Sequence, residues 1–364
     1  MSNFLRYKGF DWFLLGMVLL IAALGVMEIY SATYRTKFAG AHEKQIYWIL
    51  AGIMLMFLMT MIDYHTLMEQ VPIMYLVSIV LLAMVLVVGR KVFGSRRWIP
   101  LAGGFHFQVS EFVKLVIILA VARYFSEARQ SKVAVGDLVK VGLLAGVPMG
   151  LVLLQPDLGT SLTYAPIVMM GVLLAGIRLK HVALVALLAA LAMPMAWHYG
   201  LKPYQKARLT TFLNPEGDPL KAGYQVLQSK IAVGHGGLWG RGTTKGTQMQ
   251  LGFLPVPHTD FIFAAFAEEH GFFGVLAALL LYFIVLMRLV HNAQTAPDRA
   301  GVFIVMGVVG VLLFHVLVNV GMVIGYMPTT GIPLPLMSYG GSSVLFIFMA
   351  LGLVNNVRLR RFVN

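Results

Sequence analysis

The chain has 364 residues, of which 59% are hydrophobic and 12% are charged, about half the charged share of roughly 25% in ordinary globular proteins. With a mean hydropathy of +0.81, this composition excludes a water-soluble fold and intrinsic disorder, and most of the chain is expected to face lipid. The absence of cysteine excludes disulfide scaffolds and thiolate metal sites, and the net charge of +13 fits cytoplasmic loops beside anionic headgroups better than nucleic-acid binding.

Apolar runs of about 20 residues, the length of one membrane crossing, recur along the chain. They predict about ten transmembrane helices, near residues 11–31, 46–62, 71–89, 110–126, 139–155, 160–176, 181–199, 272–291, 302–326 and 338–356. No small-residue cleavage site follows the first run, so we expect an anchor and not a signal peptide. The sequence therefore predicts an all-α polytopic membrane protein whose residues 1–364 form a single integral membrane domain.

Basic residues in the short connecting segments predict the orientation, because short cytoplasmic loops collect Lys and Arg. With the N-terminus inside, the short inner segments carry Arg6, Lys8, Arg123, Arg129, Lys132, Lys140, Arg178, Lys180, Arg288, Arg299, Arg358, Arg360 and Arg361. The short outer loops carry fewer, namely Arg35, Lys37, Lys44, Arg90, Lys91, Arg96 and Arg97. Both termini are thus predicted to be cytoplasmic.

Residues 200–271 form the longest polar stretch, predicted to be a large extracytoplasmic loop between the seventh and eighth spans. Loops of this length are usually functional or disordered, and the aromatic, Pro and Gly content here favours an ordered lid on the membrane. A short surface helix is expected around Gln225–Ile231. The glycines of 234–246 lack the spacing of a phosphate-binding P-loop, and the histidines, including His235, His258 and His270, lack the spacing of metal ligands.

Asp260 is the first candidate for chemistry. It lies in the segment FLPVPHTDFIF at the outer edge of the eighth span, ahead of Glu268 and Glu269. The neighbouring Phe261 and Phe263 should partly desolvate the carboxylate, and desolvation raises the pKa of an acid towards the range of a general base. Because Asp before an apolar helix is as commonly an N-cap, the pattern leaves both roles open.

A basic outer loop and a polar start to the fourth span provide the second group. Arg96 and Arg97 stand beside Trp98, and arginines at headgroup level suit a pyrophosphate through charge-assisted, bidentate hydrogen bonds. The simpler alternative is that they only extend to lipid headgroups. Glu111 and Lys114 are three residues apart on one helical face, so we expect them to pair, and ionisable residues inside a membrane are functional candidates.

The third group is the segment from Gln155 to Thr160, which predicts a tight turn between the fifth and sixth spans. Asp157 in this turn either caps the following helix or lines a cavity, and capping is the simpler interpretation. Taken alone, these residues describe a membrane protein with an acidic and basic cavity on its outer side. That description fits a transporter as well as an enzyme.

The C-terminal segment narrows the choice. The stretch NVGMVIGYMPTTGIPLPLMSYGGSS, from Asn319 to Ser343, resembles the signature of the SEDS (shape, elongation, division and sporulation) family. The resemblance continues, in the family's order, through GSRRW at 94–98, the pair formed by Ser110 and Glu111 with Lys114, QPDLGT at 155–160, GTQ at 246–248 and HTDFIFA at 258–264. The segments QP and GIPLPL are more similar to the elongation members than to the division members.

This resemblance implies a ten-span bundle that polymerises lipid II, a polyprenyl-pyrophosphate-linked disaccharide peptide, into glycan strands on the outer face of the cytoplasmic membrane. The family's essential aspartate corresponds to Asp260, and its polar intramembrane residues correspond to Arg97, Glu111, Lys114 and Asp157, as substrate or structural contacts. A class B penicillin-binding protein transpeptidase and other elongation-complex proteins are the implied partners. Nucleic acid is not among them.

The implied mechanism is an inverting glycosyl transfer with Asp260 as general base. No cofactor is fixed by the sequence, although a divalent cation (Mg²⁺ or Mn²⁺) could assist the leaving pyrophosphate. Val256 stands where the family commonly has a glutamate, which argues against a metal site requiring two carboxylates beside Asp260. Two alternatives remain at this stage: a lipid II flippase, in which Glu111 and Lys114 lie on a translocation path, and a scaffold that is insensitive to Asp260.

Overall fold

The computed structural model of the chain describes residues 9–34, 36–92, 95–100, 106–128, 133–214, 217 and 222–361. Six residues used in the sequence analysis lie outside the described residues, namely Arg6, Lys8, Arg35, Gly94, Arg129 and Lys132. In the described part of the chain, the regular secondary structure is helical apart from one small sheet. The all-α fold class is therefore confirmed.

A helix is found at each of the ten predicted positions. The helices are α1 (Trp12–Thr33), α2 (Ala41–Met61), α3 (Tyr64–Glu69), α4 (Val71–Val88), α5 (Val109–Glu127), α6 (Val135–Leu154), α7 (Leu158–Leu162), α8 (Ala165–Leu174), α9 (Leu179–Met195), α10 (Pro203–Leu213), α11 (Ala222–Gly236), α12 (Thr247–Gln250), α13 (Ile262–Gln294), α14 (Arg299–Val323) and α15 (Gly341–Arg360). A single π-helical turn, Ala196–Gly200, extends α9.

Seven of the described helices are long and apolar enough to cross a membrane: α1, α2, α4, α6, α13, α14 and α15. The chain is accordingly a multi-pass membrane protein. The remaining predicted spans correspond to α5, which carries several charges, and to the shorter apolar helices α7–α8 and α9. The count of ten crossings stays a prediction.

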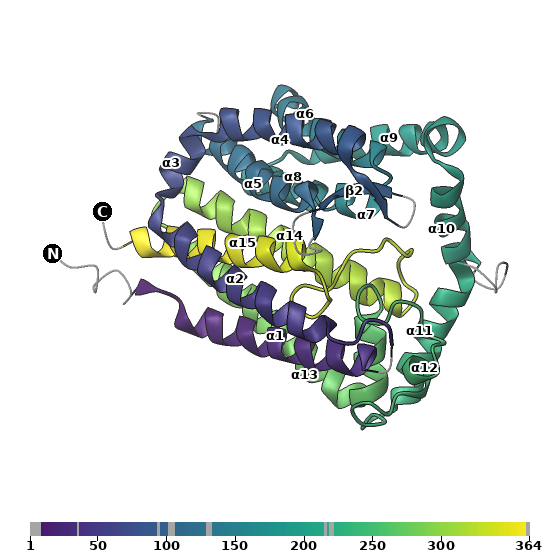
Figure 1. Cartoon of the computed structure of the whole chain (residues 1–364). Coiled ribbons are helices and arrows are strands. Elements are labelled where there is room, and N and C mark those ends of the chain that lie inside the picture. Colours follow the sequence, from purple (N-terminus) through teal and green to yellow (C-terminus); the bar gives the residue numbers. More distant parts are fainter. Residues whose placement is uncertain are drawn as a thin grey trace.

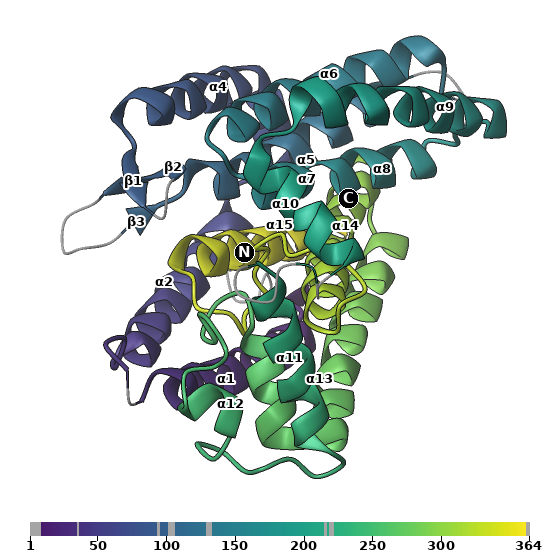
Figure 2. The same ribbon diagram turned by 90° about the vertical axis from the view of Figure 1, so that its right-hand side faces the viewer.

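The centre of the bundle is formed by α14 and α15. In each of these two helices, 72% of the apolar membrane-length window is buried inside the protein. The corresponding share is 22% in α2 and in α4. Figures 1 and 2 both show α4, α6 and α9 on one side of this central pair, with α1, α11 and α13 on the other. Helices that are apolar on all sides and buried this deeply define the core, whereas the more exposed ones present apolar surface to lipid.

At one end of the bundle, the start of α1 is tied to the ends of α13 and α15. Asp11 caps α1 by accepting a hydrogen bond from the backbone N–H of Leu14 (3.1 Å). Its carboxylate also accepts from Arg288 Nε (2.8 Å) and Asn292 Nδ2 (2.9 Å) of α13, and pairs with Arg358 of α15 (3.3 Å). The described beginning and end of the chain therefore lie at the same end of the bundle (Figure 1).

At the opposite end lies the segment between α9 and α13, which carries α10, α11 and α12 (Figure 1). The surface helix expected around Gln225–Ile231 is found as the longer α11. The basic connection between α4 and α5, predicted as a loop, instead holds a small antiparallel sheet, β1 (Arg90–Val92), β2 (Ser95–Pro100) and β3 (His106–Phe107), in the order β1-β2-β3. These two connections supply Arg97, Arg208 and Asp260 to the site described next.

The glycines between α11 and α12 have a packing role. Helix α13 breaks at Gly271 (φ +65°), and the carbonyl group of Glu268, near this break, accepts a hydrogen bond from the N–H of Arg241 (3.0 Å). Gly240 has φ +81°, and a Cβ there would lie 2.1 Å from the carbonyl oxygen of Glu269. Glycine at position 240 therefore permits both the left-handed backbone and the close approach to α13.

Candidate active site

Asp260 lies in the turn that precedes α13 and does not cap it. The N-cap of this helix is Phe261, without a side-chain hydrogen bond, so the capping interpretation is wrong for Asp260. Its backbone carbonyl accepts a hydrogen bond from Asn319 Nδ2 of α14 (3.0 Å), and the neighbouring Thr259 carbonyl accepts from Ser338 Oγ (2.7 Å). The turn is thus anchored to the C-terminal signature segment, which leaves the carboxylate of Asp260 available for chemistry.

The electrostatic surroundings of Asp260 are mixed. Burial raises the pKa of the Asp260 carboxyl above its ordinary value of 3.8, the positive charges of Arg97 and Arg208 oppose that rise, and the negative charge of Asp157 adds to it. Four polar residues from separate segments therefore act on one another here: Arg97 on β2, Asp157 before α7, Arg208 on α10 and Asp260 before α13.

Arg97 and Asp157 form a direct ion pair, with Nη1 3.2 Å from Oδ2. The Asp157 side chain is 4% exposed and that of Arg97 is 29% exposed. Asp157 also accepts from Gln108 Nε2 (3.0 Å) and from the N–H of Thr160 (3.1 Å), which makes it the N-cap of α7. The capping interpretation of Asp157 is therefore confirmed, and the same carboxylate pairs with an arginine that remains partly accessible.

Glu111 and Lys114 pair as the sequence predicted. Lys114 Nζ donates to both carboxylate oxygens of Glu111, at 3.0 and 2.9 Å. The ammonium group also lies 3.4 Å from His315 Nε2 and 4.2 Å from the centre of the Phe346 ring. Because Lys114 has no exposed surface, this pair packs α5 against α14 and α15 in the present conformation. Its position in this structure is therefore that of a buried ion pair between helices.

Arg208 is a site residue that the sequence analysis missed. Its Nη1 donates to the backbone carbonyl of Thr330 (3.2 Å). The next residue, Gly331, has φ +74°, and a Cβ there would lie 3.4 Å from Oδ2 of Asp260. Arg208 and Asp260 thus lie beside neighbouring residues of the signature segment. The sequence signal for Arg208 was only a basic charge in a long outer loop, which does not distinguish it from its neighbours.

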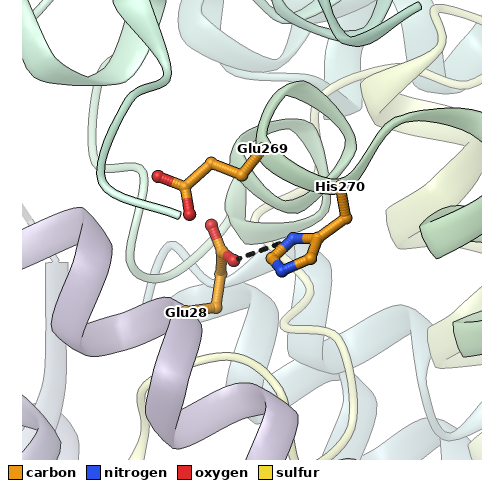
Figure 3. Close-up of side chains that lie close together, drawn as sticks. All are labelled: Glu28, Glu269 and His270. Atoms are coloured by element: carbon orange, nitrogen blue, oxygen red, sulfur yellow. Dashed lines mark ion pairs between the residues drawn. The ribbon is translucent and has the colours of Figure 1, made fainter. Parts of the chain in front are cut away.

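The site around Asp260 does not resemble a metal centre built on two carboxylates, because the Asp157 oxygens already accept from Arg97, Gln108 and Thr160. In the part of the chain that the structure describes, the group of His, Asp and Glu donor atoms close enough to hold a metal ion is Glu28, Glu269 and His270 (Figure 3). Sequence spacing missed this group because Glu28 lies on a different helix. No reaction step at Asp260 is assigned to a metal ion.

Comparison with known proteins identifies the family. The chain matches the cell cycle protein family of FtsW, RodA and SpoVE over residues 10–361. It is 33% identical to the peptidoglycan glycosyltransferase RodA of Treponema pallidum, covering 98% of this chain and 100% of that protein. It is 38% identical to the peptidoglycan glycosyltransferase MrdB of Escherichia coli K12, covering 95% and 93%. The chain belongs to the SEDS family.

Solved structures of SEDS proteins agree with this assignment. A chain from a peptidoglycan synthase complex that coordinates polymerization and crosslinking superposes with a TM-score of 0.85 at 35% identity, covering 98% of this chain and 99% of that one. The crystal structure of the rod shape determining protein RodA of Thermus thermophilus gives a TM-score of 0.72 at 31% identity, covering 97% and 98%. The sequence resemblance is therefore confirmed over nearly the full length of the chain.

Proposed function

We propose that this SEDS protein is a peptidoglycan glycosyltransferase that polymerises lipid II into glycan strands on the outer face of the cytoplasmic membrane during cell elongation. The enzyme class is that of relatives 33–38% identical to it over most of the chain. The observation that carries the mechanism is the carboxylate of Asp260, free of any capping role and placed within the field of Arg97 and Arg208.

Asp260 acts as the general base of an inverting transfer. The 4-hydroxyl oxygen of the acceptor sugar attacks the anomeric carbon of the donor, and its proton passes to the Asp260 carboxylate. The bond between that carbon and the donor phosphate oxygen breaks, and its electron pair leaves with the polyprenyl pyrophosphate. A raised pKa suits this role, because a more basic carboxylate accepts the proton more readily.

Arg97 and Arg208 stabilise the leaving pyrophosphate. Negative charge grows on the leaving group during the transfer, and guanidinium groups fixed beforehand around that position stabilise the transition state. Asp157 holds Arg97 in place through their 3.2 Å ion pair. Glu111 and Lys114 are buried in this structure, so their proposed contact with the substrate requires the helices around them to separate.

This chemistry is proposed to take place at the membrane surface. We assign ten crossings with both termini in the cytoplasm and residues 200–271 outside. The polyprenyl tail of the substrate then stays in lipid while its sugars reach the polar site. A class B penicillin-binding protein is the partner whose transpeptidase cross-links the product. The superposition on a chain from a synthase complex supports that pairing.

The function is tested with the purified chain and its penicillin-binding protein in detergent, where no separate compartments exist. Fluorescent lipid II should become glycan polymer, resolved by gel electrophoresis, and the partner alone should make none. If the chain instead moves lipid II across vesicle membranes and forms no polymer in detergent, it is a flippase and the proposal fails.

A further inference from the structure

A second polar cluster lies inside the bundle, between α1 and α13. Figure 3 shows the side chains of Glu28, from α1, and of Glu269 and His270, from α13, pointing toward one another. Each offers a ligand atom within 4.8 Å of the other two. The cluster does not include Asp260, and Glu269 lies roughly 10 Å along α13 from the first residue of that helix.

The hydrogen bonding of this cluster is incomplete. Glu28 has no exposed surface, and neither of its carboxylate oxygens has a hydrogen-bond partner. His270 Nδ1 is 3.8 Å away from Glu28 Oε2, too far for a hydrogen bond. Oε2 of Glu269 is also buried and unpartnered, whereas its Oε1 accepts from Ser31 Oγ and from the N–H of Thr244. Three buried carboxylate oxygens of this cluster therefore lack a hydrogen-bond donor.

Two buried, ionised carboxylates side by side are unfavourable unless a proton or a cation neutralises them. Each loses its hydration, and their charges repel at short range. The neighbouring Glu268 does not relieve this, because it is acidic too and its own oxygens accept from Thr247, Gln248 and Met249. A divalent cation would balance the two negative charges and supply the missing partner for all three oxygens.

We propose that Glu28, Glu269 and His270 bind one divalent transition-metal ion, of which Zn²⁺ is the first to test. Imidazole favours Zn²⁺ and similar ions over Mg²⁺ and Ca²⁺, which take oxygen ligands. Bonds of about 2.0–2.2 Å to Zn²⁺ require only small side-chain movements, given donors already within 4.8 Å of one another. The His270 ring is held for this purpose by stacking on Phe266, with centroids 4.4 Å apart.

The ion would join two helices to the outer loop. Glu28 belongs to α1 and Glu269 to α13, while Thr244 of the loop donates to both Glu269 and Ser31. Metal bound between them would hold residues 241–250 against the bundle. This role is structural and does not depend on the glycosyl transfer.

Metal binding is measured on the full chain, purified without a polyhistidine tag and stripped with chelator. Equilibrium dialysis against Zn²⁺, followed by elemental analysis, should give one tightly bound Zn²⁺ per chain, and Zn²⁺ should raise the thermal unfolding temperature by several degrees. Glu28→Gln and His270→Ala should each lose the bound ion and the shift. The matched control is His291→Ala, an exposed histidine on the same helix, which should retain both.

A second measurement needs no variant. Co²⁺ added to the stripped wild-type chain should give the visible absorption of a low-coordinate site with nitrogen and oxygen ligands, and Zn²⁺ should abolish it. The proposal is overturned if wild-type and His270→Ala chains retain equal Zn²⁺, or if Mg²⁺ stabilises the chain as much as Zn²⁺ does. It is also overturned if Co²⁺ shows only the spectrum of the hydrated ion.

Discussion

Two opposing influences act on the carboxylate of Asp260. Burial raises its pKa, and the guanidinium groups of Arg97 and Arg208 limit the rise. The ionised form of a carboxyl group whose pKa is raised in this way is a better proton acceptor than an exposed aspartate. In the proposed mechanism, the same two arginines that limit the pKa rise also stabilise the leaving group. One arrangement would then serve both halves of the transfer.

Replacing the carboxylate with an amide tests the base directly. Asp260→Asn keeps the shape of the side chain but cannot accept the proton, so polymerisation of lipid II should fall by about 100- to 10,000-fold. Expression and partner binding should be unchanged. Glu43→Gln, which makes the same acid-to-amide change at an exposed position on α2, is the control and should keep wild-type activity. Near-normal glycan synthesis by the Asn variant would show that Asp260 is not the catalytic base.

The pH dependence of wild-type activity is a separate prediction. Only the ionised carboxylate accepts a proton, so the rate should decline as the pH falls through the pKa of Asp260. Since burial raises that pKa above 3.8, the acidic limb of the pH–rate profile should have its midpoint above this value. A midpoint at or below the ordinary value would contradict the role of burial.

Arg208 provides a test of the leaving-group contact. In the proposed mechanism, Arg208→Ala removes a charge-assisted hydrogen bond to the pyrophosphate. Hydrogen bonds of this kind contribute about 1.5–3 kcal/mol, so turnover should fall by roughly 10- to 100-fold. Lys206→Ala removes a positive charge two residues away on α10 and should have little effect. The comparison is made by steady-state polymerisation at matched enzyme concentration. Equal losses in the two variants would mean that only diffuse attraction of lipid headgroups operates.

At the scale of elements, the sequence predicts the long helices, because each coincides with a long apolar run. It does not predict the short strands or the break within α13. Each run predicted a helix because about 20 apolar residues have few other stable arrangements in a membrane. The small sheet at 90–107 was missed because its strands have only two to six residues, too few to show alternation. The break at Gly271 was missed because one glycine in an apolar run is compatible with a continuous helix.

The site was only partly predictable for a related reason. Glu111 and Lys114 are neighbours on one helix, so their pairing followed from spacing. Arg208 and Asp260 are distant in sequence, and they come together where the signature segment brings Thr330 beside Arg208 and Gly331 beside Asp260. Glu28 meets His270 across two helices that are more than 200 residues apart in sequence. Contacts of this kind depend on tertiary packing, which no local pattern encodes.

Two glycines of the outer segment should respond oppositely to the same substitution. Gly240→Ala places a Cβ 2.1 Å from a backbone oxygen of α13 at φ +81°, so it should lower the free energy of unfolding by about 1–3 kcal/mol. Gly234→Ala, at an exposed helical position with open space around it, should raise it by up to about 1 kcal/mol. Thermal unfolding in detergent measures both. A stabilised Gly240→Ala protein would show that the loop does not pack on α13 as described.

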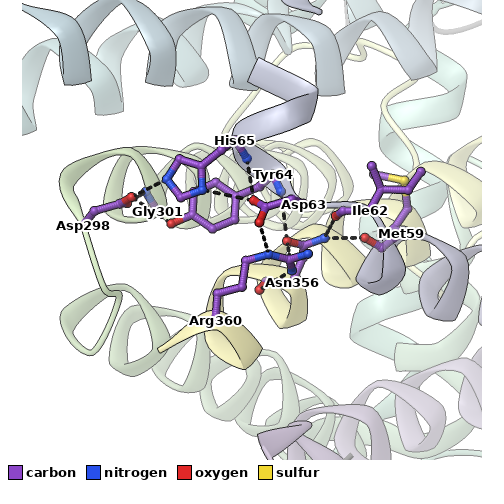
Figure 4. Close-up of polar contacts among 9 residues, drawn as sticks. All are labelled: Met59, Ile62, Asp63, Tyr64, His65, Asp298, Gly301, Asn356 and Arg360. Carbon is purple, nitrogen blue, oxygen red and sulfur yellow. Dashed lines mark hydrogen bonds and ion pairs between the residues drawn. The ribbon is translucent and has the colours of Figure 1, made fainter. Parts of the chain in front are cut away.

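At the scale of the whole molecule, ion pairs join several helices at the end of the bundle where α1 begins and α15 ends. Figure 4 shows one such network, in which Asp63 after α2 pairs with Arg360 of α15 (2.8 Å) and His65 bridges to Asp298 before α14 (2.8 Å). His65 Nδ1 also lies 3.0 Å from Asp63. These contacts join the connections that precede α3 and α14 to the end of α15.

The neighbouring network at Asp11 allows a test of how much this end contributes to stability. Its carboxylate is buried and faces both Arg288 and Arg358. Asp11→Asn keeps the shape but leaves two guanidinium groups without their counter-ion, so the free energy of unfolding should fall by about 3–5 kcal/mol. The exposed acid-to-amide change Glu43→Gln should cost almost nothing.

Acid titration separates the charge of Asp11 from its shape. Burial works to raise the pKa of Asp11, but hydrogen bonds from Arg288 and Asn292 outweigh it, and the pKa is lowered below 3.8. A carboxyl group whose pKa is lower in the folded state stabilises the fold fully above its unfolded pKa and loses that contribution as the pH falls through the folded value. The stability difference between wild-type and Asp11→Asn should therefore be constant near neutral pH and shrink below about 3.8. Unfolding temperatures of both proteins, measured in detergent across this range, should converge at the acidic end. A difference that persists there would mean that the amide disturbs packing and that the ion pairs contribute little.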